Sequence, residues 1–385
     1  MKKPEKRPNS PYFCSGPTCK HPGWNLSNLN DALLGRGHRT PAGQAKLKQI
    51  IDLTREILEV PDDYRIAIMP GSATGALECA LWNFLGARGV DVFSWDLFGH
   101  LWVTDIVDQL HIPDTRTYSV SFGEIPNLSA HKPDRDVVFT WNGTTAGVCV
   151  PHLDWISENR EGLSICDATS AAFCVSLDWS KLDVTTFSWQ KGLGSEGAHG
   201  MLILGPRAVK RLLNYTPSWP IPRLFRLTNN QGLIEEIFQG GMINTPSLLS
   251  VEDCLSALSW AKNIGGLSTL IDRCKANALT ISKWVNQTPW LGYLAKDPDT
   301  ISPTSVCLEI LDELGNPLPE DRHRSLILAI EAQLANEKAA FDIRNHRYSP
   351  PSLRIWAGPT IETSDLEDLF PWIEWSYWQN INPTT

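Results

Sequence analysis

The sequence predicts an α/β fold with a mostly parallel sheet that carries polar groups at its strand ends. Three observations support this prediction. Short β-rich apolar runs alternate with helical periodicity up to about residue 260. Lys191 follows the apolar run 184–188 and is succeeded by glycines, and Asp167 ends the run 163–167. Because the carboxyl ends of parallel strands meet at one edge of a sheet, we expect Lys191 and Asp167 to face one cleft.

The elements of this α/β part are expected in the following order. Helical periodicity beginning near Pro41 predicts a helix from about residue 41 to 59. A strand at 65–69 precedes a helix at 72–85, and a strand at 90–95 precedes a helix at about 101–110. Further strands are expected at 137–141, 164–166, 184–188 and 201–204.

The chain of 385 residues is long enough for more than one domain. We expect an irregular N-terminal segment at 1–30 that packs on the body, a large α/β domain at 31–264, and a smaller α+β domain at 265–385. Gly265-Gly266 marks the boundary. In the last domain, helices are expected at 267–287, at 320–336 and from about 364, and strands at 305–310 and 352–356. Trp372, Trp375 and Trp378 share one helix face, which indicates a core or subunit-contact stripe.

Charge and composition argue against several function classes. The formal net charge of -9 disfavours a nucleic-acid or anionic-membrane partner. No stretch approaches the ~18 apolar residues of a membrane span, and no apolar segment of a signal peptide follows the N-terminus. The nine cysteines include no Cys-x-x-Cys pair, which indicates reduced thiols. A catalytic role for one of them is an alternative. We expect a soluble, cytoplasmic protein without a metal site.

Lys191 and Asp167 together fit pyridoxal 5'-phosphate (PLP) chemistry. A lysine amine forms a Schiff base with this cofactor, and a carboxylate keeps the pyridinium nitrogen protonated. A PLP enzyme is therefore the leading interpretation of this pair.

A small-residue turn supplies a candidate phosphate site. The segment Gly71-Ser72-Ala73-Thr74-Gly75 lies between the strand at 65–69 and the next helix. Backbone N–H groups at a helix N-terminus, together with hydroxyl donors, bind anions. The alternative is that Ser72 merely caps the helix.

The glycines after Lys191 match the spacing of a dinucleotide-binding pattern but not its structural context. Gly192, Gly194 and Gly197 have the required spacing, but the pattern must open a helix. Here it runs into the apolar run 200–204, which we expect to be a strand. We therefore interpret these glycines as a tight turn beside Lys191 and disfavour a nicotinamide site.

Aromatic and basic residues complete the candidate set. Trp102 follows a glycine-containing stretch at 98–101, which we expect to be a loop, and an aromatic ring there can stack on a flat cofactor or belong to the core. Arg354 lies between Leu353 and Ile355, so an inward side chain would need an anionic partner. The pairs that can bind a second anion, or instead lie in solvent, are His38-Arg39 and His346-Arg347.

The ordered set of these motifs resembles the phosphoserine aminotransferase family of class V, fold-type I PLP enzymes. The resemblance spans nearly the whole chain and is greatest to the alphaproteobacterial and methanogen branch. No single motif carries it. Its segments are Cys14-Ser15-Gly16-Pro17, His38-Arg39, 71–75, Trp102, Asn142-Gly143-Thr144, 167–170, Trp189-Gln190-Lys191, 243–246, His346-Arg347 and Arg354.

The resemblance implies a role for each site residue. Lys191 would carry the cofactor and shuttle a proton, Asp167 would pair with the pyridine nitrogen, and Trp102 would stack on the ring. Thr144 would bond near the ring hydroxyl. The cofactor phosphate would be held by Ala73, Thr74 and Gln190, and from the neighbouring subunit of a homodimer by Asn244 and Thr245. Arg354 would bind the substrate α-carboxylate, and His38, Arg39, His346 and Arg347 the second anionic group.

The implied reaction is amino transfer between L-glutamate and 3-phosphohydroxypyruvate, in serine and pyridoxine biosynthesis. Two departures leave strict preference for a phosphorylated substrate open. Thr74 stands where other branches have an arginine, and Gln44 and Lys46 follow His38-Arg39 where a further arginine is expected. The alternatives are another class V aminotransferase, a cysteine desulfurase, or a non-catalytic protein of this fold. Gln190 before Lys191 disfavours the desulfurase, in which a histidine usually stands there.

Overall fold

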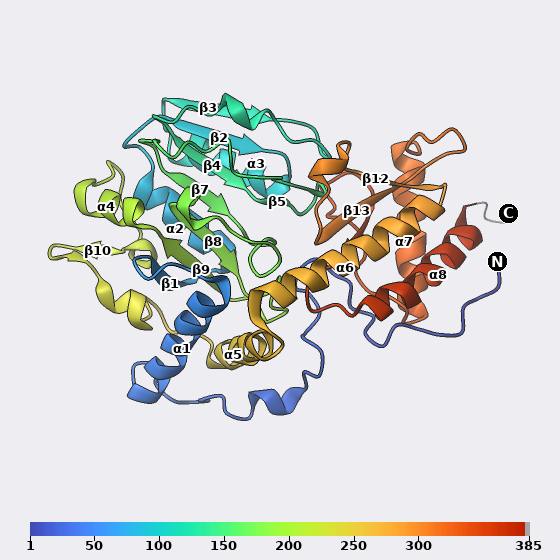
Figure 1. The fold of residues 1–385 in the computed structure, drawn as a ribbon, viewed down its shortest axis with the longest axis horizontal. Helices are drawn as coiled ribbons and strands as arrows, with labels where there is room; N and C mark the ends of the chain where they lie inside the picture. Colours follow the sequence, from blue (N-terminus) through green and yellow to red (C-terminus); the bar gives the residue numbers. More distant parts are fainter. Residues whose placement is uncertain (382–385) are drawn as a thin grey trace.

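The structure is a computed structural model in which residues 1–381 are described. Its body is a seven-stranded sheet, with helices on both faces, beside a second and smaller part (Figure 1). All neighbouring strands are parallel except β9, which is antiparallel to β1 and β8. The mostly parallel sheet predicted from the sequence is thus confirmed. In spatial order the strands are β1 (Arg65–Pro70), β9 (His199–Leu204), β8 (Val184–Ser188), β7 (Ser164–Asp167), β4 (Asp136–Thr140), β2 (Val90–Ser94) and β3 (Thr115–Ser119).

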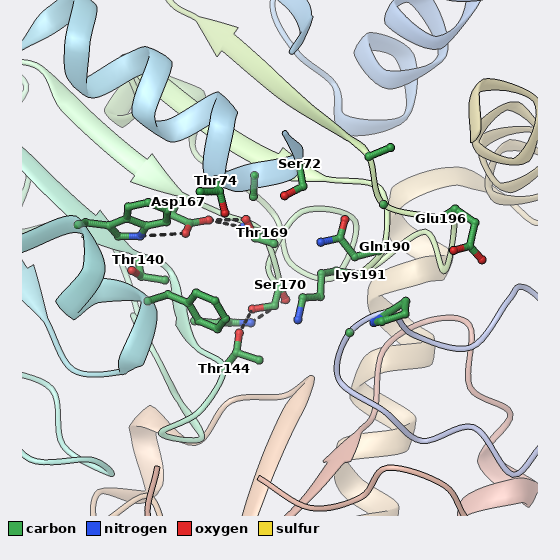
Figure 2. Close-up of a pocket in the computed structure, with 18 residues that line it drawn as sticks. Ser72, Thr74, Thr140, Thr144, Asp167, Thr169, Ser170, Gln190, Lys191 and Glu196 are labelled. Atoms are coloured by element: carbon green, nitrogen blue, oxygen red, sulfur yellow. Dashed lines mark hydrogen bonds between the residues drawn. The ribbon is translucent and has the colours of Figure 1, made fainter. Parts of the chain in front are cut away.

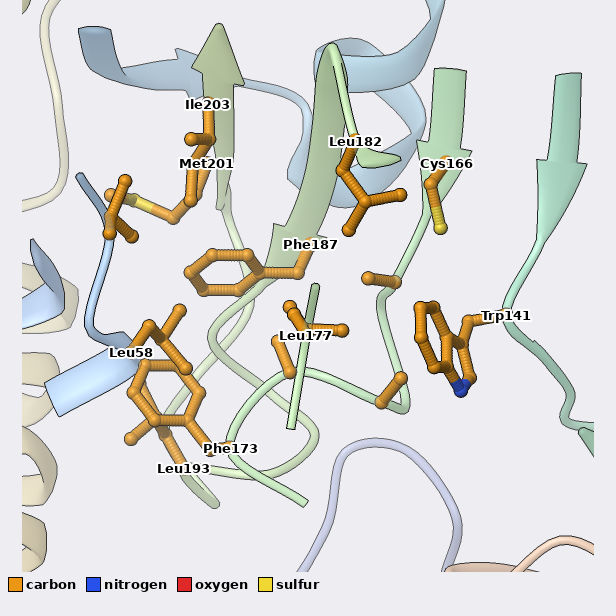
Figure 3. Close-up of a cluster of buried hydrophobic side chains, with 14 of the residues drawn as sticks. Leu58, Trp141, Cys166, Phe173, Leu177, Leu182, Phe187, Leu193, Met201 and Ile203 are labelled. Carbon is orange, nitrogen blue, oxygen red and sulfur yellow. The ribbon is translucent and has the colours of Figure 1, made fainter. Parts of the chain in front are cut away.

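Most strands of this sheet are apolar on both faces because both faces are buried. Successive side chains alternate between the faces, so β9 sends Met201 and Ile203 into one hydrophobic cluster and Leu202 and Leu204 into another. Figure 3 shows the first cluster, in which Phe187 of β8 lies beside Met201.

Two layers of helices cover these faces. On one side α1 (Pro41–Leu58) and α5 (Leu248–Asn263) pack together, and Leu47 and Val251 enter the first cluster. On the other side α2 (Ser72–Phe84), α3 (Leu97–Thr104) and α4 (Pro206–Asn214) contribute Leu77, Trp102 and Ala208 to the second cluster. The chain therefore forms an α/β/α sandwich.

The smaller part has a hydrophobic core of its own. It contains α6 (Gly266–Gln287), α7 (Glu320–Asn336), α8 (Thr363–Asn380) and an antiparallel sheet of β12 (Leu291–Tyr293), β13 (Ser305–Ile310) and β14 (Leu353–Trp356). Phe13 of the N-terminal segment joins this core, and Trp372 Nε1 donates a hydrogen bond to the Lys6 carbonyl oxygen at 2.7 Å. Leu267 and Leu270 at the start of α6 pack in the first cluster of the body, and the division of the chain at residue 265 stays a prediction.

The remaining elements are short. Two hairpins pair β5 (Asn142–Gly143) with β6 (Val148–Cys149) and β10 (Thr228–Asn229) with β11 (Gly232–Leu233). Single helical turns are η1 (Leu26–Leu29), η3 (Leu128–Ala130), η4 (Trp179–Lys181), η5 (Arg223–Phe225), η6 (Glu235–Gln239) and η7 (Pro298–Thr300). Within residues 1–381, no helix combines the length and apolar character needed to cross a bilayer.

Two sequence predictions about these elements were wrong, and one strand was not predicted. The helix placed at 101–110 begins at Leu97, because the Asp96 side chain accepts a hydrogen bond from Gly99 N and caps it, and it ends in a π-helical turn, η2 (Asp105–Gln109). The expected loop at 98–101 is therefore helical. Strand β3 was not predicted because its residues are polar and partly exposed. Trp372 and Trp375 are core residues, while Trp378 is 53% exposed in the single chain, so its part in a subunit contact stays a prediction.

Candidate active site

A cavity of about 460 Å³ lies at the carboxyl ends of β4, β7 and β8, against the first turn of α2. Figure 2 shows Thr74, Asp167, Gln190 and Lys191 among the side chains that line it. The fold thus brings together residues separated by more than a hundred positions. The predicted site residues on its wall are Ala73, Thr74, Trp102, Thr144, Asp167, Gln190 and Lys191.

Lys191 lies in a tight turn three residues after β8. Gly194 N donates to the Lys191 carbonyl oxygen at 2.9 Å, and the Lys191 ammonium donates to the Ser15 carbonyl oxygen. The ammonium also lies against Gly16, where any Cβ would collide with it. Burial and the positive charge of Arg354 lower the pKa of Lys191 to about 8. A buried amine with this pKa is a nucleophile near neutral pH.

Asp167 is the last residue of β7 and is held by three donors. Trp102 Nε1 donates to its Oδ2 at 3.2 Å, and both the backbone N (3.0 Å) and the hydroxyl of Thr169 donate to its Oδ1. Burial raises the pKa of Asp167, while the bonds from Thr169 and Trp102 and the charge of Lys191 act in the opposite direction. The surroundings of Asp167 therefore orient a carboxylate toward the cavity.

The first turn of α2 supplies the candidate phosphate site. Gly71 adopts a left-handed conformation with φ of 80° and occupies the N-cap position, so the alternative that Ser72 caps the helix is wrong. The N–H groups of Gly71 and Ser72 donate to the Ala198 carbonyl oxygen at 3.1 and 3.2 Å. The next amides, of Ala73 and Thr74, belong to a helix turn that offers no intrahelical acceptor and are available to an anion.

Buried polar atoms on the cavity wall show what kind of group fits there. Thr140 Oγ1, Asn142 Oδ1 and Gln190 Oε1 are buried, border the cavity, and have no hydrogen-bond partner among residues 1–381. Thr144 Oγ1 bonds Ser170 Oγ at 2.8 Å beside them. A ring with polar substituents would satisfy such atoms, which cost stability when left unpaired. These residues therefore fit PLP.

The predicted turn after Lys191 is confirmed. The glycine pattern 192–197 leads into β9, which is a strand, so it cannot open a helix over a dinucleotide. At Gly194 (φ of 63°) a side chain would strike the backbone of Cys19. The glycines thus permit the close approach of the N-terminal segment.

Arg354 lies near the cavity without bordering it. It stands on β14 opposite Cys307 of β13, and its Nε atom is buried without a partner among residues 1–381. Burial, and then the charges of Arg354 and Arg347, lower the pKa of His346, which places that histidine in the same basic neighbourhood. Arg347 is exposed and borders a different cavity with Tyr348.

The single chain does not bring every predicted residue to this cavity. Arg39 is exposed and borders another cavity, of about 310 Å³, while His38 is buried next to it in sequence. Asn244 and Thr245 directly follow Ile243, which borders that second cavity.

Sequence reasoning missed the residues that clamp the Lys191 turn. Thr18 donates through its N to the Gln190 carbonyl oxygen (3.0 Å) and through its hydroxyl to the Lys191 carbonyl oxygen (2.6 Å). Asp253 of α5 accepts at 2.7 Å from Lys20 Nζ, Ser195 Oγ and Glu196 N. These contacts span at least 57 positions of sequence, and no local pattern signals them.

Comparison with known proteins shows the family of the chain. No family model matches it. A phosphoserine aminotransferase from Methanosarcina mazei is 50% identical over 375 residues, which are 97% of this chain and 99% of the relative. The fold matches a phosphoserine aminotransferase from Cytophaga hutchinsonii with a TM-score of 0.79, at 18% identity over 95% of this chain and 98% of that one.

Other solved structures show how widely this fold is used. The match to a PLP-bound phosphoserine aminotransferase from Trichomonas vaginalis has a TM-score of 0.74, at 15% identity over 95% of this chain and 100% of that one. An alanine–glyoxylate aminotransferase from Nostoc matches with a TM-score of 0.78, at 18% identity over 98% of this chain and 97% of that one. The fold alone therefore does not select a substrate, but the identity to the Methanosarcina relative is decisive for the family. The chain belongs to the phosphoserine aminotransferase family.

Proposed function

We propose that this chain catalyses reversible amino transfer between L-glutamate and 3-phosphohydroxypyruvate, which gives O-phospho-L-serine and 2-oxoglutarate for serine biosynthesis. Membership of the phosphoserine aminotransferase family makes it a PLP-dependent transaminase. The observation that carries the proposal is the pairing of Lys191 and Asp167 in one cavity with the first turn of α2. When bound, PLP withdraws electrons from the substrate Cα and so makes its proton labile.

We assign a separate role in the reaction to each of several residues of the cavity. We assign the covalent attachment and the movement of a proton between substrate Cα and the cofactor C4′ to Lys191 Nζ, whose lowered pKa of about 8 suits a base. Asp167 holds the ring nitrogen protonated through its ionised carboxylate. Trp102 orients Asp167 and covers the ring. Thr144 forms a hydrogen bond near the hydroxyl group of the cofactor ring.

Anion binding completes the assignment. The amides of Ala73 and Thr74 and the side chain of Gln190 hold the cofactor phosphate, and the helix N-terminus adds about half a positive charge. Arg354 holds the substrate α-carboxylate as a planar, bidentate partner. The second anionic group of the substrate is assigned to His38, Arg39, His346 and Arg347.

A homodimer forms part of this proposal. The family resemblance assigns Asn244 and Thr245 to the cofactor phosphate of the neighbouring subunit, and neither residue borders the Lys191 cavity of its own chain. A cytoplasmic location is supported by nine cysteines that are all free thiols.

A cysteine desulfurase is disfavoured by the state of Cys307. This thiol is buried in β13, and its burial raises its pKa to about 12. A mobile thiolate nucleophile needs the opposite environment.

The proposed substrate is tested by a panel of half-reactions. The PLP-loaded protein is mixed separately with O-phospho-L-serine, L-serine, L-alanine and L-glutamate, and the loss of its visible absorption is followed. We expect fast conversion by O-phospho-L-serine and L-glutamate and slow conversion by L-serine and L-alanine. If O-phospho-L-serine reacts no faster than L-alanine, the chain is an aminotransferase for another substrate pair.

A further inference from the structure

A second cavity, of about 310 Å³, is lined by three arginines from two distant segments. Arg39 precedes α1, Arg223 belongs to η5, and Arg226 follows η5 directly. Met242 and Ile243 also line it. The cavity is thus a concentration of guanidinium groups outside the Lys191 site.

The positive charges of these three arginines are not paired with carboxylates in the described part of the same chain. Among residues 1–381, no carboxylate oxygen lies within 4.0 Å of a side-chain nitrogen of Arg39, Arg223 or Arg226. Glu236 is the one acidic residue among those that line the cavity, while the neighbouring Glu235 pairs with Arg65 at 3.4 Å. Three cations against one carboxylate, in a chain whose net charge is -9, indicate a site for an added anion.

The walls of the cavity are fixed by close backbone packing. A Cβ at Gly240 (φ of 90°) would lie 2.8 Å from Lys48 N and 2.9 Å from Gln44 O of α1. A Cβ at Gly43 would lie 2.7 Å from the His38 backbone, so the loop that carries Arg39 is held against the start of α1. The loop that carries Arg39 and the segment before Met242 are therefore packed closely against α1, while Arg223 and Arg226 are exposed residues of another segment.

The position of the cavity relates it to the neighbouring subunit. Met242 and Ile243 continue directly into Asn244 and Thr245, which we assign to the cofactor phosphate of the partner. A cavity on the same segment would open beside the partner's substrate.

We propose that Arg223 and Arg226 act with Arg39 as the subsite for the distal anionic group of the substrate bound by the partner subunit. This inference rests on the proposed function. It accounts for Gln44 and Lys46, which follow His38-Arg39 in place of a further arginine, since the charge comes instead from a segment about 180 residues later. A phosphate dianion gains more from these guanidinium groups than a carboxylate does, so the subsite favours a phosphorylated substrate.

The test compares Arg223→Gln, Arg226→Gln and the double variant with Arg116→Gln. Arg116 is an exposed arginine on β3, in the sheet edge farthest from β1, and serves as the matched control. For O-phospho-L-serine we expect kcat/KM to fall about tenfold for each arginine removed, mainly through KM, since a hydrogen bond to a charged group is lost. L-glutamate should lose less, and L-alanine, which has no distal anion, should be unaffected.

Inorganic phosphate is the second probe. It should inhibit the wild-type protein competitively with O-phospho-L-serine, and the double variant should need a higher phosphate concentration for the same inhibition. Unchanged KM and unchanged phosphate inhibition in the double variant would overturn the inference, as would equal losses for O-phospho-L-serine and L-alanine. In either case a wild-type protein that prefers O-phospho-L-serine leaves the proposed function standing. A wild type without that preference contradicts the proposed function itself.

Discussion

Trp102 Nε1 donates a hydrogen bond of 3.2 Å to Asp167 Oδ2, and this bond connects α3 with the carboxyl end of β7. Trp102 is 3% exposed and Asp167 is 4% exposed, so the bond is shielded from water. A donor to a buried carboxylate favours its charged form, which is the form the cofactor nitrogen requires. The indole donor therefore stabilises the ionised form of Asp167, in addition to the stacking on the ring that we propose for it.

Trp102→Phe keeps an aromatic ring and removes this donor. Because the pKa of Asp167 is already raised by burial, losing the donor should raise it further, so the acidic limb of the kcat–pH profile should move to higher pH. We expect kcat/KM to fall about tenfold, as for a lost hydrogen bond to a charged group. Trp219→Phe is the control, since Trp219 Nε1 donates to the Trp82 carbonyl oxygen outside the pocket. An unchanged acidic limb of the kcat–pH profile in Trp102→Phe would contradict the electrostatic role of the indole.

The lowered pKa of Lys191 predicts the pH dependence of cofactor capture by the PLP-free protein. The neutral amine is the reactive form, so the capture rate should rise with pH around a midpoint of about 8 rather than 10.5. Arg354→Gln removes a positive charge that lowers this pKa, so the midpoint should move to higher pH. Arg344→Gln, which removes a surface partner of Glu331, should leave the midpoint in place. Equal midpoints in all three proteins would contradict this account of the lysine.

Asp253 should control how firmly the Lys191 turn is held. Asp253→Asn removes the charge that binds Lys20 and weakens the acceptor for Ser195 and Glu196, so PLP should dissociate faster. The neighbouring Glu252→Gln is the matched control, because Glu252 pairs with Lys46 instead. The check is the rate of PLP loss after dilution, measured at temperatures well below unfolding. If both variants release PLP at the same rate, Asp253 has no special part in holding the turn.

A side chain at Gly16 should displace the Lys191 ammonium. In Gly16→Ala the new Cβ would overlap the end of the Lys191 side chain and force it to shift, so PLP binding should weaken while the far-ultraviolet circular dichroism is retained. At Gly37 a Cβ would meet only the Thr40 methyl group at 3.5 Å, which makes Gly37→Ala the control. Normal PLP binding by Gly16→Ala would mean that the lysine is not confined in this way.

The sequence predicted the sheet well because its strands are buried on both faces and are bounded by turns. Residues 184–188 match β8 throughout, and 320–336 match α7. The prediction failed where tertiary context decided the local structure. The Asp96 cap starts α3 four residues before the predicted start, and β3, whose residues are polar, is a strand because it pairs with β2.

The candidate site was predictable to the extent that it is built from strand ends and a helix start. Lys191 and Asp167 reached one cavity because parallel neighbouring strands align their carboxyl ends. The clamp by Thr18 could not be predicted, since it joins residues 173 positions apart through an irregular segment. The places of Arg39 and Asn244 in a shared site remain proposals, because they depend on a second subunit.

Lys191→Ala tests the central claim most directly, with the exposed Lys132→Ala as control. Each purified protein is mixed with PLP, O-phospho-L-serine and 2-oxoglutarate as the amino acceptor, and the formation of L-glutamate and the visible absorption of bound PLP are followed together. We expect Lys191→Ala to lose both product formation and the absorption of lysine-bound cofactor while its melting temperature stays close to that of the PLP-free wild type. Full turnover by Lys191→Ala, with that absorption intact, would contradict the assignment of Lys191 as the cofactor-binding base.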